Sequence, residues 1–163
     1  MARLVLIDAS PLIGLTRVDG LGWLRPLFGE VYMPAEVRDE VLAGSGAADE
    51  PSIRTAEAAG ILRVWPKPSP AQPDLPDLDE GESACIRIGL AHDGPALLLM
   101  DERAGRAVAQ EHGLHVAGTA GVIGMARSRG WIPSARAAFA RLHASDFRIS
   151  ASVIETVLRR VGE

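Results

Sequence analysis

Short apolar runs along the chain alternate with longer stretches in which apolar residues recur at helical spacing. The apolar runs predict buried strands at residues 4–7, 31–33, 61–65, 96–100 and 114–116. Strands without polar alternation, each followed by a helix, are typical of a parallel sheet covered on both faces. The pattern therefore predicts an α/β fold, a three-layer α/β/α sandwich with a central parallel sheet of four to five strands.

The stretches between the apolar runs predict the helices. We expect them at residues 22–28, 34–42, 52–59, 79–92, 102–112, 119–128, 134–143 and 150–161. A further helix should begin at Ser10-Pro11, because serine caps free amides and proline suits a first helical turn. The prolines between residues 66 and 76 predict an ordered surface connector rather than a domain boundary. One domain over residues 1–163 is therefore expected.

Composition narrows the class of protein. The 163 residues are 47% hydrophobic, enough to fill a core. No apolar run approaches the roughly 20 residues of a membrane helix, and the N-terminal run breaks at Asp8, too early for a signal peptide. Cys85 is the only cysteine, which excludes an internal disulfide. We therefore expect a cytoplasmic protein that does not enter the membrane.

Charge is distributed unevenly along the chain. The net charge is −4, but residues 101–163 carry nine basic side chains, all arginine, against six acidic ones. Arginine binds phosphate in a planar, bidentate manner, so this half is compatible with RNA. Alternatively, arginine is simply the preferred basic residue here, since Lys67 is the only lysine.

Two aspartates follow predicted strands. Asp8 comes directly after residues 4–7 and Asp101 directly after residues 96–100. Right-handed crossovers place all strand carboxyl ends at one edge of a parallel sheet, where ligands bind in open α/β folds. Both are candidate ligand-binding residues; the alternative for each is a turn or helix-capping role.

Two glutamates could join them. Glu82 shares a helical face with Ile86 and Gly89 and should point toward the sheet, although Asp79 and Glu82 also fit a capping box. Glu40 is the acid nearest the apolar stripe of helix 34–42; its alternative is a solvated surface position.

Four carboxylates gathered at one place would repel one another. They remain ionised only if cations compensate them, and oxygen ligands select hard ions such as Mg²⁺ or Mn²⁺. Such an ion can activate water for in-line attack on a phosphodiester. Asp8, Glu40, Glu82 and Asp101 are therefore predicted as both metal ligands and catalytic residues.

The sequence resembles the PIN domains, the fold of the VapC-type toxin ribonucleases, and more narrowly a PIN-like subgroup of prokaryotic proteins. The resemblance covers nearly the whole chain, through the stretches LVLIDASPLIGL, FGEVYMPAEVRDEVLAG, LDEGESACIRIGLA, LLLMDERAGRAVA and VAGTAGVIGMARSRGWIP. It implies a metal-dependent endoribonuclease whose four acids match Asp8, Glu40, Glu82 and Asp101. Toxin members bind a small antitoxin protein and often form homodimers, so RNA, an antitoxin and a second copy are the implied partners.

The same resemblance suggests residues for binding substrate. Ser10 matches a small hydroxyl residue two positions after the first acid, and Thr119 could supply another hydroxyl. Arg103 and Arg106 could contact the phosphate backbone, or simply form an exposed helix face. Two positions depart from the common pattern: Glu82 stands where many PIN nucleases have Asp, and Leu99 where many have Ser or Thr.

Three other functions are compatible with parts of this sequence. The main one is a catalytically silent PIN-like module that binds RNA or protein. A phosphoryl-transfer domain with Asp8 as nucleophile lacks a second acid two residues on. Histidine catalysis has little support, because the four histidines fall near predicted helix ends or in loops.

Overall fold

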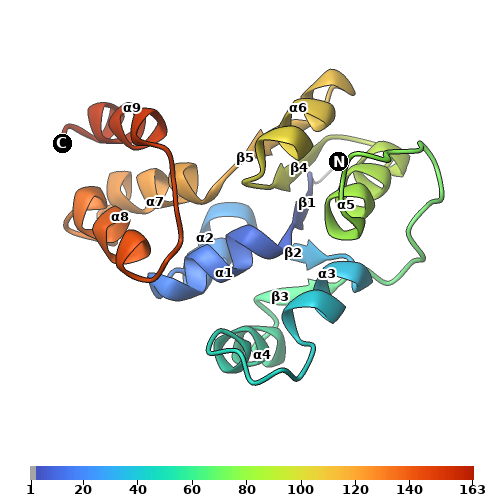
Figure 1. Cartoon of the computed structure of the whole chain (residues 1–163), viewed down its shortest axis with the longest axis horizontal. Coiled ribbons are helices and arrows are strands. Elements are labelled where there is room, and N and C mark those ends of the chain that lie inside the picture. Colours follow the sequence, from blue (N-terminus) through green and yellow to red (C-terminus); the bar gives the residue numbers. More distant parts are fainter. Residues whose placement is uncertain (1–2) are drawn as a thin grey trace.

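A single parallel sheet runs through the middle of the molecule. The computed structural model describes residues 3–163 and contains strands β1 (Leu4–Ile7), β2 (Val31–Met33), β3 (Leu62–Val64), β4 (Ala96–Leu99) and β5 (His115–Ala117). They lie in the order β3-β2-β1-β4-β5, with every neighbouring pair parallel. The structure confirms the predicted α/β/α sandwich with a parallel sheet, here of five strands (Figure 1).

Helices cover both faces of this sheet. On one side lie α3 (Ala35–Val41), α5 (Glu80–Ala91) and α6 (Arg103–Glu111), and on the other lie α1 (Ala9–Arg17) and α2 (Leu24–Phe28), preceded by a short 3₁₀ helix, η1 (Leu21–Trp23). Helix α4 (Glu50–Ala58) packs beside β3. The layers bury β1 and β4 completely, so these two central strands form a rigid base for the carboxyl edge of the sheet. We call this the acidic edge, because Asp8, Glu40, Asp79, Glu82 and Asp101 lie close together there.

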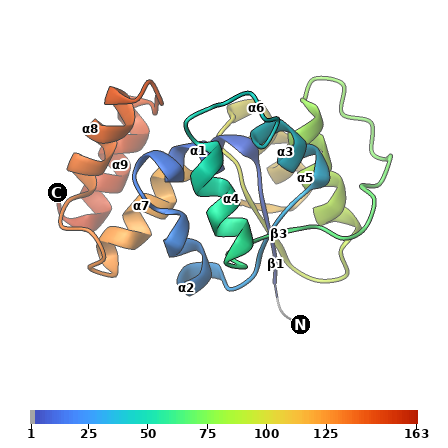
Figure 2. The same ribbon diagram turned by 90° about the horizontal axis from the view of Figure 1, so that it is seen from below.

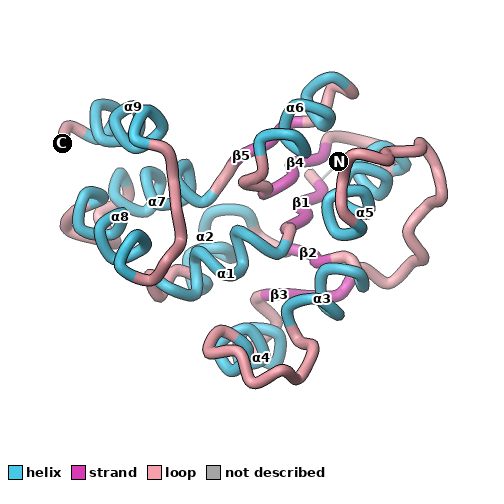
Figure 3. The backbone as a smooth tube through the Cα atoms, viewed as in Figure 1, coloured by secondary structure: helices cyan, strands magenta, loops and turns pink. Residues whose placement is uncertain are grey.

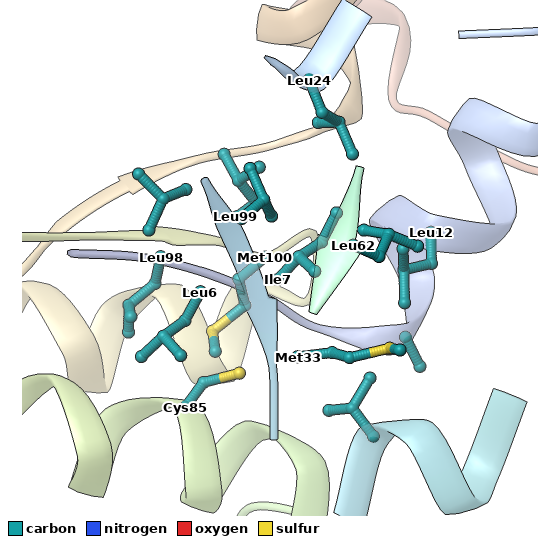
Figure 4. Packing of buried hydrophobic residues seen from close by; sticks show 14 of the residues in the cluster. Leu6, Ile7, Leu12, Leu24, Met33, Leu62, Cys85, Leu98, Leu99 and Met100 are labelled. Carbon is teal, nitrogen blue, oxygen red and sulfur yellow. The ribbon is translucent and has the colours of Figure 1, made fainter. Parts of the chain in front are cut away.

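The sheet core is built from the apolar strands themselves. Leu6, Ile7, Leu98 and Leu99 are fully buried, as is Cys85 on α5 (Figure 4). Cys85 is therefore a small core residue, as the sequence indicates.

The C-terminal helices form a second apolar cluster. Helices α7 (Thr119–Ser128), α8 (Ala135–Ala144) and α9 (Ala151–Val161) pack on one another. They lie together at one end of the molecule, beside α1 and away from α5 (Figures 1 and 2).

Long irregular segments connect some of these elements. The proline-rich connector between β3 and α5 runs along the outside of the molecule, as expected (Figure 3). The helix expected from Ser10-Pro11 is α1, which begins one residue earlier, at Ala9, with Pro11 in its first turn. Its N-cap is Asp8, which makes no side-chain cap hydrogen bond, so the capping role expected of Ser10 is wrong. Among residues 3–163 no helix is both long and apolar enough to cross a membrane.

Candidate functional site

Asp8 and Asp101 stand at the carboxyl ends of neighbouring central strands. Ile7 of β1 pairs with Leu99 of β4, and the Asp8 N–H donates to the Leu99 carbonyl over 3.0 Å. Asp101 directly follows Met100, whose N–H donates to the Ala117 carbonyl. The parallel register therefore brings the two carboxylates together, although they are far apart in sequence.

Asp8 is an acid buried among other acids. Its exposed fraction is 3%. Burial raises the pKa of Asp8 to about 7, the adjacent Ala9 amide opposes this rise, and the charges of Asp79, Glu40 and Asp101 add to it. Asp8 forms no ion pair with a basic side chain of residues 3–163. Ionised Asp8 is therefore costly unless a cation approaches it.

Glu82 is the second buried acid at this edge, with an exposed fraction of 6%. The Asp79 carboxylate caps α5 by accepting the Glu82 N–H over 2.8 Å, as the capping-box interpretation predicts. Burial raises the pKa of Glu82 to about 8, and hydrogen bonding with Asp79 and the charges of Asp79 and Asp8 add to it. The cap and the inward-pointing acid thus coexist in the same first turn.

Glu40 lies at the exposed rim of this group, together with Asp79. Partial desolvation raises the pKa of Glu40, and the charge of Asp79 raises it further. The sequence predicted only a capping role for Asp79, yet this carboxylate influences Asp8, Glu40 and Glu82 alike. Its spacing as an N-cap gave no sign of that, because the proximity arises from the packing of α3 on α5.

Asp101 has a different environment. Its Oδ1 accepts the Thr119 N–H and its Oδ2 accepts the Thr119 hydroxyl, each over 2.7 Å. Burial raises the pKa of Asp101, while both Thr119 hydrogen bonds and the Arg106 charge lower it. Arg106 is itself held in place, donating from Nη1 to the Met100 carbonyl over 2.9 Å. This carboxylate is partly compensated by its own protein.

Three glycines line the acidic edge, and sequence reasoning missed all of them. A Cβ added at Gly81 would lie 2.9 Å from Asp8 Oδ1, and one at Gly118 would lie 2.7 Å from Asp101 Oδ1. A Cβ at Gly105 would collide with Glu82 Oε2. Each glycine therefore leaves the space that one carboxylate occupies, a requirement of tertiary packing that local sequence does not reveal.

The residues predicted to bind substrate differ in their exposure to solvent. Ser10 is half-buried in the first turn of α1, and Arg103 is exposed at the start of α6. Arg106 is half-buried beside Gly118. Thr119 is fully buried, and its hydroxyl donates a hydrogen bond to Asp101 instead of facing solvent. Their roles toward substrate remain predictions.

The chemistry of this edge suits a hard divalent ion. All its donors are carboxylate oxygens, which Mg²⁺ and Mn²⁺ prefer, and Asp8 and Glu82 are buried without a basic partner among residues 3–163. Within that range, however, no three His, Cys, Asp or Glu side chains are arranged so that they could hold one ion. Mg²⁺ commonly uses only one or two carboxylates and completes its shell with water and phosphate. The residues therefore fit an open site rather than a closed cage.

Comparison with known proteins identifies the family. A family model described as a PIN domain matches residues 4–163. No curated protein and no solved structure matched the chain. PIN domains are generally nucleases, typically use divalent metal ions and generally bind RNA. Because the match spans nearly the whole sequence, the chain belongs to the PIN domain family.

Proposed function

We propose that this protein is a metal-dependent endoribonuclease that cleaves RNA phosphodiester bonds. The observation that carries the proposal is the pair of buried acids, Asp8 and Glu82, neither of which forms an ion pair within residues 3–163. Glu50, the remaining buried carboxylate of those residues, shows the contrast: it accepts the Gly44 and Ser45 N–H groups and lies 3.9 Å from Arg54. Burying acids without such partners disfavours the charged state, so two such acids together at a sheet edge support a binding role.

Asp8, Glu40, Glu82 and Asp101 are the proposed ligands and catalytic residues, and Asp79 joins them. Asp8 and Asp101 present oxygens from fixed strand ends, while Glu82 and Asp79 present theirs from the first turn of α5. When bound, Mg²⁺ or Mn²⁺ supplies charge stabilisation for the phosphodiester and a more acidic water. Thr119 and Arg106 orient Asp101, so its carboxylate keeps one direction while substrate binds.

Arginines near the edge would hold the RNA. Arg103 is exposed and Arg106 half-buried at the start of α6, and the charge of Arg106 lowers the pKa of Asp101. Guanidinium groups there would bind phosphate oxygens bidentately, and the Ser10 hydroxyl on α1 would donate a hydrogen bond to the same phosphate backbone. If so, affinity for RNA falls steeply as salt concentration rises.

The direct test is RNA cleavage by the purified chain. A fluorogenic single-stranded RNA should be cut with Mg²⁺ or Mn²⁺ and left intact with EDTA. Asp8→Asn should lower the rate at least about 100-fold, because several kcal/mol of transition-state stabilisation would be lost. Glu155→Gln, which removes an exposed acid on α9 far from the edge, is the matched control and should cleave normally.

The outcome decides the assignment. Full cleavage by Asp8→Asn, or cleavage that EDTA does not stop, would contradict the proposal. Circular dichroism of each variant shows whether a lost activity reflects a lost fold.

A second candidate function is a catalytically silent PIN domain that binds RNA or protein. It is favoured by the absence, among residues 3–163, of three acidic, histidine or cysteine side chains positioned for one ion. RNA binding that persists in EDTA with no cleavage under any divalent metal would support this alternative.

A toxin role, with a small antitoxin as partner and a homodimer as the working form, is a further part of the proposal. It rests on the resemblance to the toxin ribonucleases. Induced expression that arrests growth, and that Asp8→Asn relieves, is the result this part predicts.

A further inference from the structure

A second candidate site lies along β5 and near the amino ends of β1 and β4. A cavity of about 800 Å³ is lined by residues of α2, the ends of β1 and β4, β5, α7 and α9. Its lining includes Arg3, which precedes β1, and Pro95, which precedes β4, whereas Asp8 and Asp101 follow these strands. We call this cavity the β5 groove. None of the acids at the acidic edge lines this groove, although its lining extends to Ala117, which precedes Gly118.

The β5 groove has an apolar floor and a basic rim. Leu27 and Phe28 of α2 line it from one side, and Met125 of α7, which is 36% exposed, lines it from another. Arg3, Arg129 and Arg160 line it too, and all three are exposed. The lining contains no Asp or Glu. None of the three arginines forms an ion pair within residues 3–163.

The groove also runs beside a strand with one free edge. β5 pairs with β4 on one side only, and the Ala117 carbonyl accepts from the N–H of Met100, which follows β4. Because backbone groups in a parallel strand alternate in direction, those of Val116 point away from β4. Val116 lines the β5 groove and is not fully buried. Its N–H and C=O can therefore pair with an extended chain lying in the groove.

We propose that the β5 groove binds an extended acidic segment of a partner protein, in which acidic and apolar side chains alternate. The apolar side chains would contact Leu27, Phe28 and Met125, the acidic ones would pair with Arg129 and Arg160, and the backbone would pair with Val116. This inference does not depend on the proposed nuclease activity, because none of these residues belongs to the acidic edge.

The lining favours a polypeptide over single-stranded RNA. RNA held without sequence preference stacks its bases on successive aromatic side chains, and the one Phe, Tyr or Trp among the lining residues is Phe28. A peptide strand needs only the free edge, apolar contacts and complementary charge, which this groove supplies together.

A pair of peptides tests the proposal. The probe is a short fluorescent peptide of alternating glutamate and leucine, and its twin carries lysine in place of glutamate. The acidic peptide should bind the intact chain saturably and at least about tenfold more tightly than the twin, because the arginines attract only one of them. Amide resonances of Val116, Gly121 and Met125 should shift on titration, while those of Asp8 and Glu82 stay fixed.

Charge variants locate the binding. Arg129→Glu and Arg160→Glu should each weaken the acidic peptide about fivefold or more. Arg148→Glu changes the net charge equally, but Arg148 is exposed outside the groove and has no ion pair within residues 3–163, so affinity should be preserved.

A steric variant tests the same site without changing charge. A Cβ at Gly121 meets no heavy atom within 4 Å, so the Gly121→Leu side chain starts in open space at the groove and also improves helix propensity. Peptide binding should be lost while thermal stability is kept. Gly22→Leu is the control: its Cβ also has open space, but Gly22 lines a different, smaller hollow.

Three results would overturn the proposal. One is equal affinity for the acidic peptide and its lysine twin, and another is binding that Gly121→Leu does not affect. The third is an oligouridylate, tested in EDTA, that shifts the groove resonances while the acidic peptide shifts none, which would assign the groove to nucleic acid.

Discussion

The two sides of the acidic edge are built differently. On the α7 side, Asp101 accepts two hydrogen bonds from Thr119, and Arg106 lowers its pKa. On the α5 side, Asp8 and Glu82 are buried and form no ion pair within residues 3–163, and the charges of neighbouring acids raise their pKa values. One side is stabilised from within the protein, while the other is left with uncompensated negative charge. The difference indicates that the α5 side is the part that requires an external cation.

The largest expected effect is on the pH dependence of stability without metal. The pKa of Asp8 is 3.8 in the unfolded chain and about 7 when folded, and that of Glu82 rises from 4.5 to about 8. At these two groups the folded state binds more protons, so their contribution to stability is fully present below about pH 4 and is lost as pH rises toward about 8. Each pKa unit corresponds to about 1.4 kcal/mol, which makes the loss from Asp8 alone about 4 kcal/mol.

Urea titrations in EDTA at several pH values measure this loss. Asp8→Asn removes one of the two groups, so the variant should gain stability relative to the wild type as pH rises. If the free energies of unfolding of the two proteins change in parallel with pH, ionised Asp8 is not destabilised by its surroundings.

Gly118→Ala should disrupt the packing around Asp101, on the α7 side of the acidic edge. The new Cβ would lie 2.7 Å from Asp101 Oδ1 and 2.9 Å from Arg106 Nη1, so both side chains must move. We expect a loss of about 3 kcal/mol in the free energy of unfolding. The control, Gly121→Ala, sits nearby in α7 with open space at its Cβ and should be neutral or slightly stabilising. Equal effects from the two variants would refute the packing argument.

Thr119→Val removes one hydrogen bond from Asp101 and changes little else. Thr119 is fully buried, and its hydroxyl is one of two donors to that carboxylate. A hydrogen bond to a charged group contributes about 2 kcal/mol, so the valine variant should lose about that much stability. Thr119→Ser restores the hydroxyl and should recover part of the loss; a serine variant no better than valine would assign Thr119 to apolar packing instead.

The smallest effect is expected at the rim. Glu40 is exposed, and its pKa is raised by partial desolvation and by Asp79. Glu40→Gln should therefore stabilise the metal-free protein at alkaline pH, by no more than about 0.5 kcal/mol because solvent screens the interaction. Thermal melts in EDTA measure this gain, and a clear destabilisation would show that Glu40 has a stabilising partner.

Much of the fold follows from local patterns. Apolar runs and helical spacing predicted every strand and the core role of Cys85, because burial on both faces of a parallel sheet leaves continuous apolar runs. Helix starts were less secure. Serine and proline indicated a start at Ser10, but the chain turns helical at Ala9 without any side-chain cap.

The site was harder to predict than the fold. The strand ends identified Asp8 and Asp101, since topology alone brings them together. Asp79 was assigned only its capping bond to Glu82, because its closeness to Asp8 and Glu40 depends on how α3 packs against α5. The space required at Gly118 and the burial of Thr119 against Asp101 are likewise products of tertiary contact.

Calorimetric titration of Mn²⁺ into the metal-free chain at about pH 8 tests most directly whether the uncompensated acids form a cation site. The wild type should bind Mn²⁺ saturably, Asp8→Asn at least about tenfold more weakly, and Glu155→Gln normally, because only ionised carboxylates at the edge attract the ion. No Mn²⁺ binding by the wild type up to about 10 mM, beyond the range of weak protein sites for divalent ions, or unchanged binding by Asp8→Asn, would contradict this account.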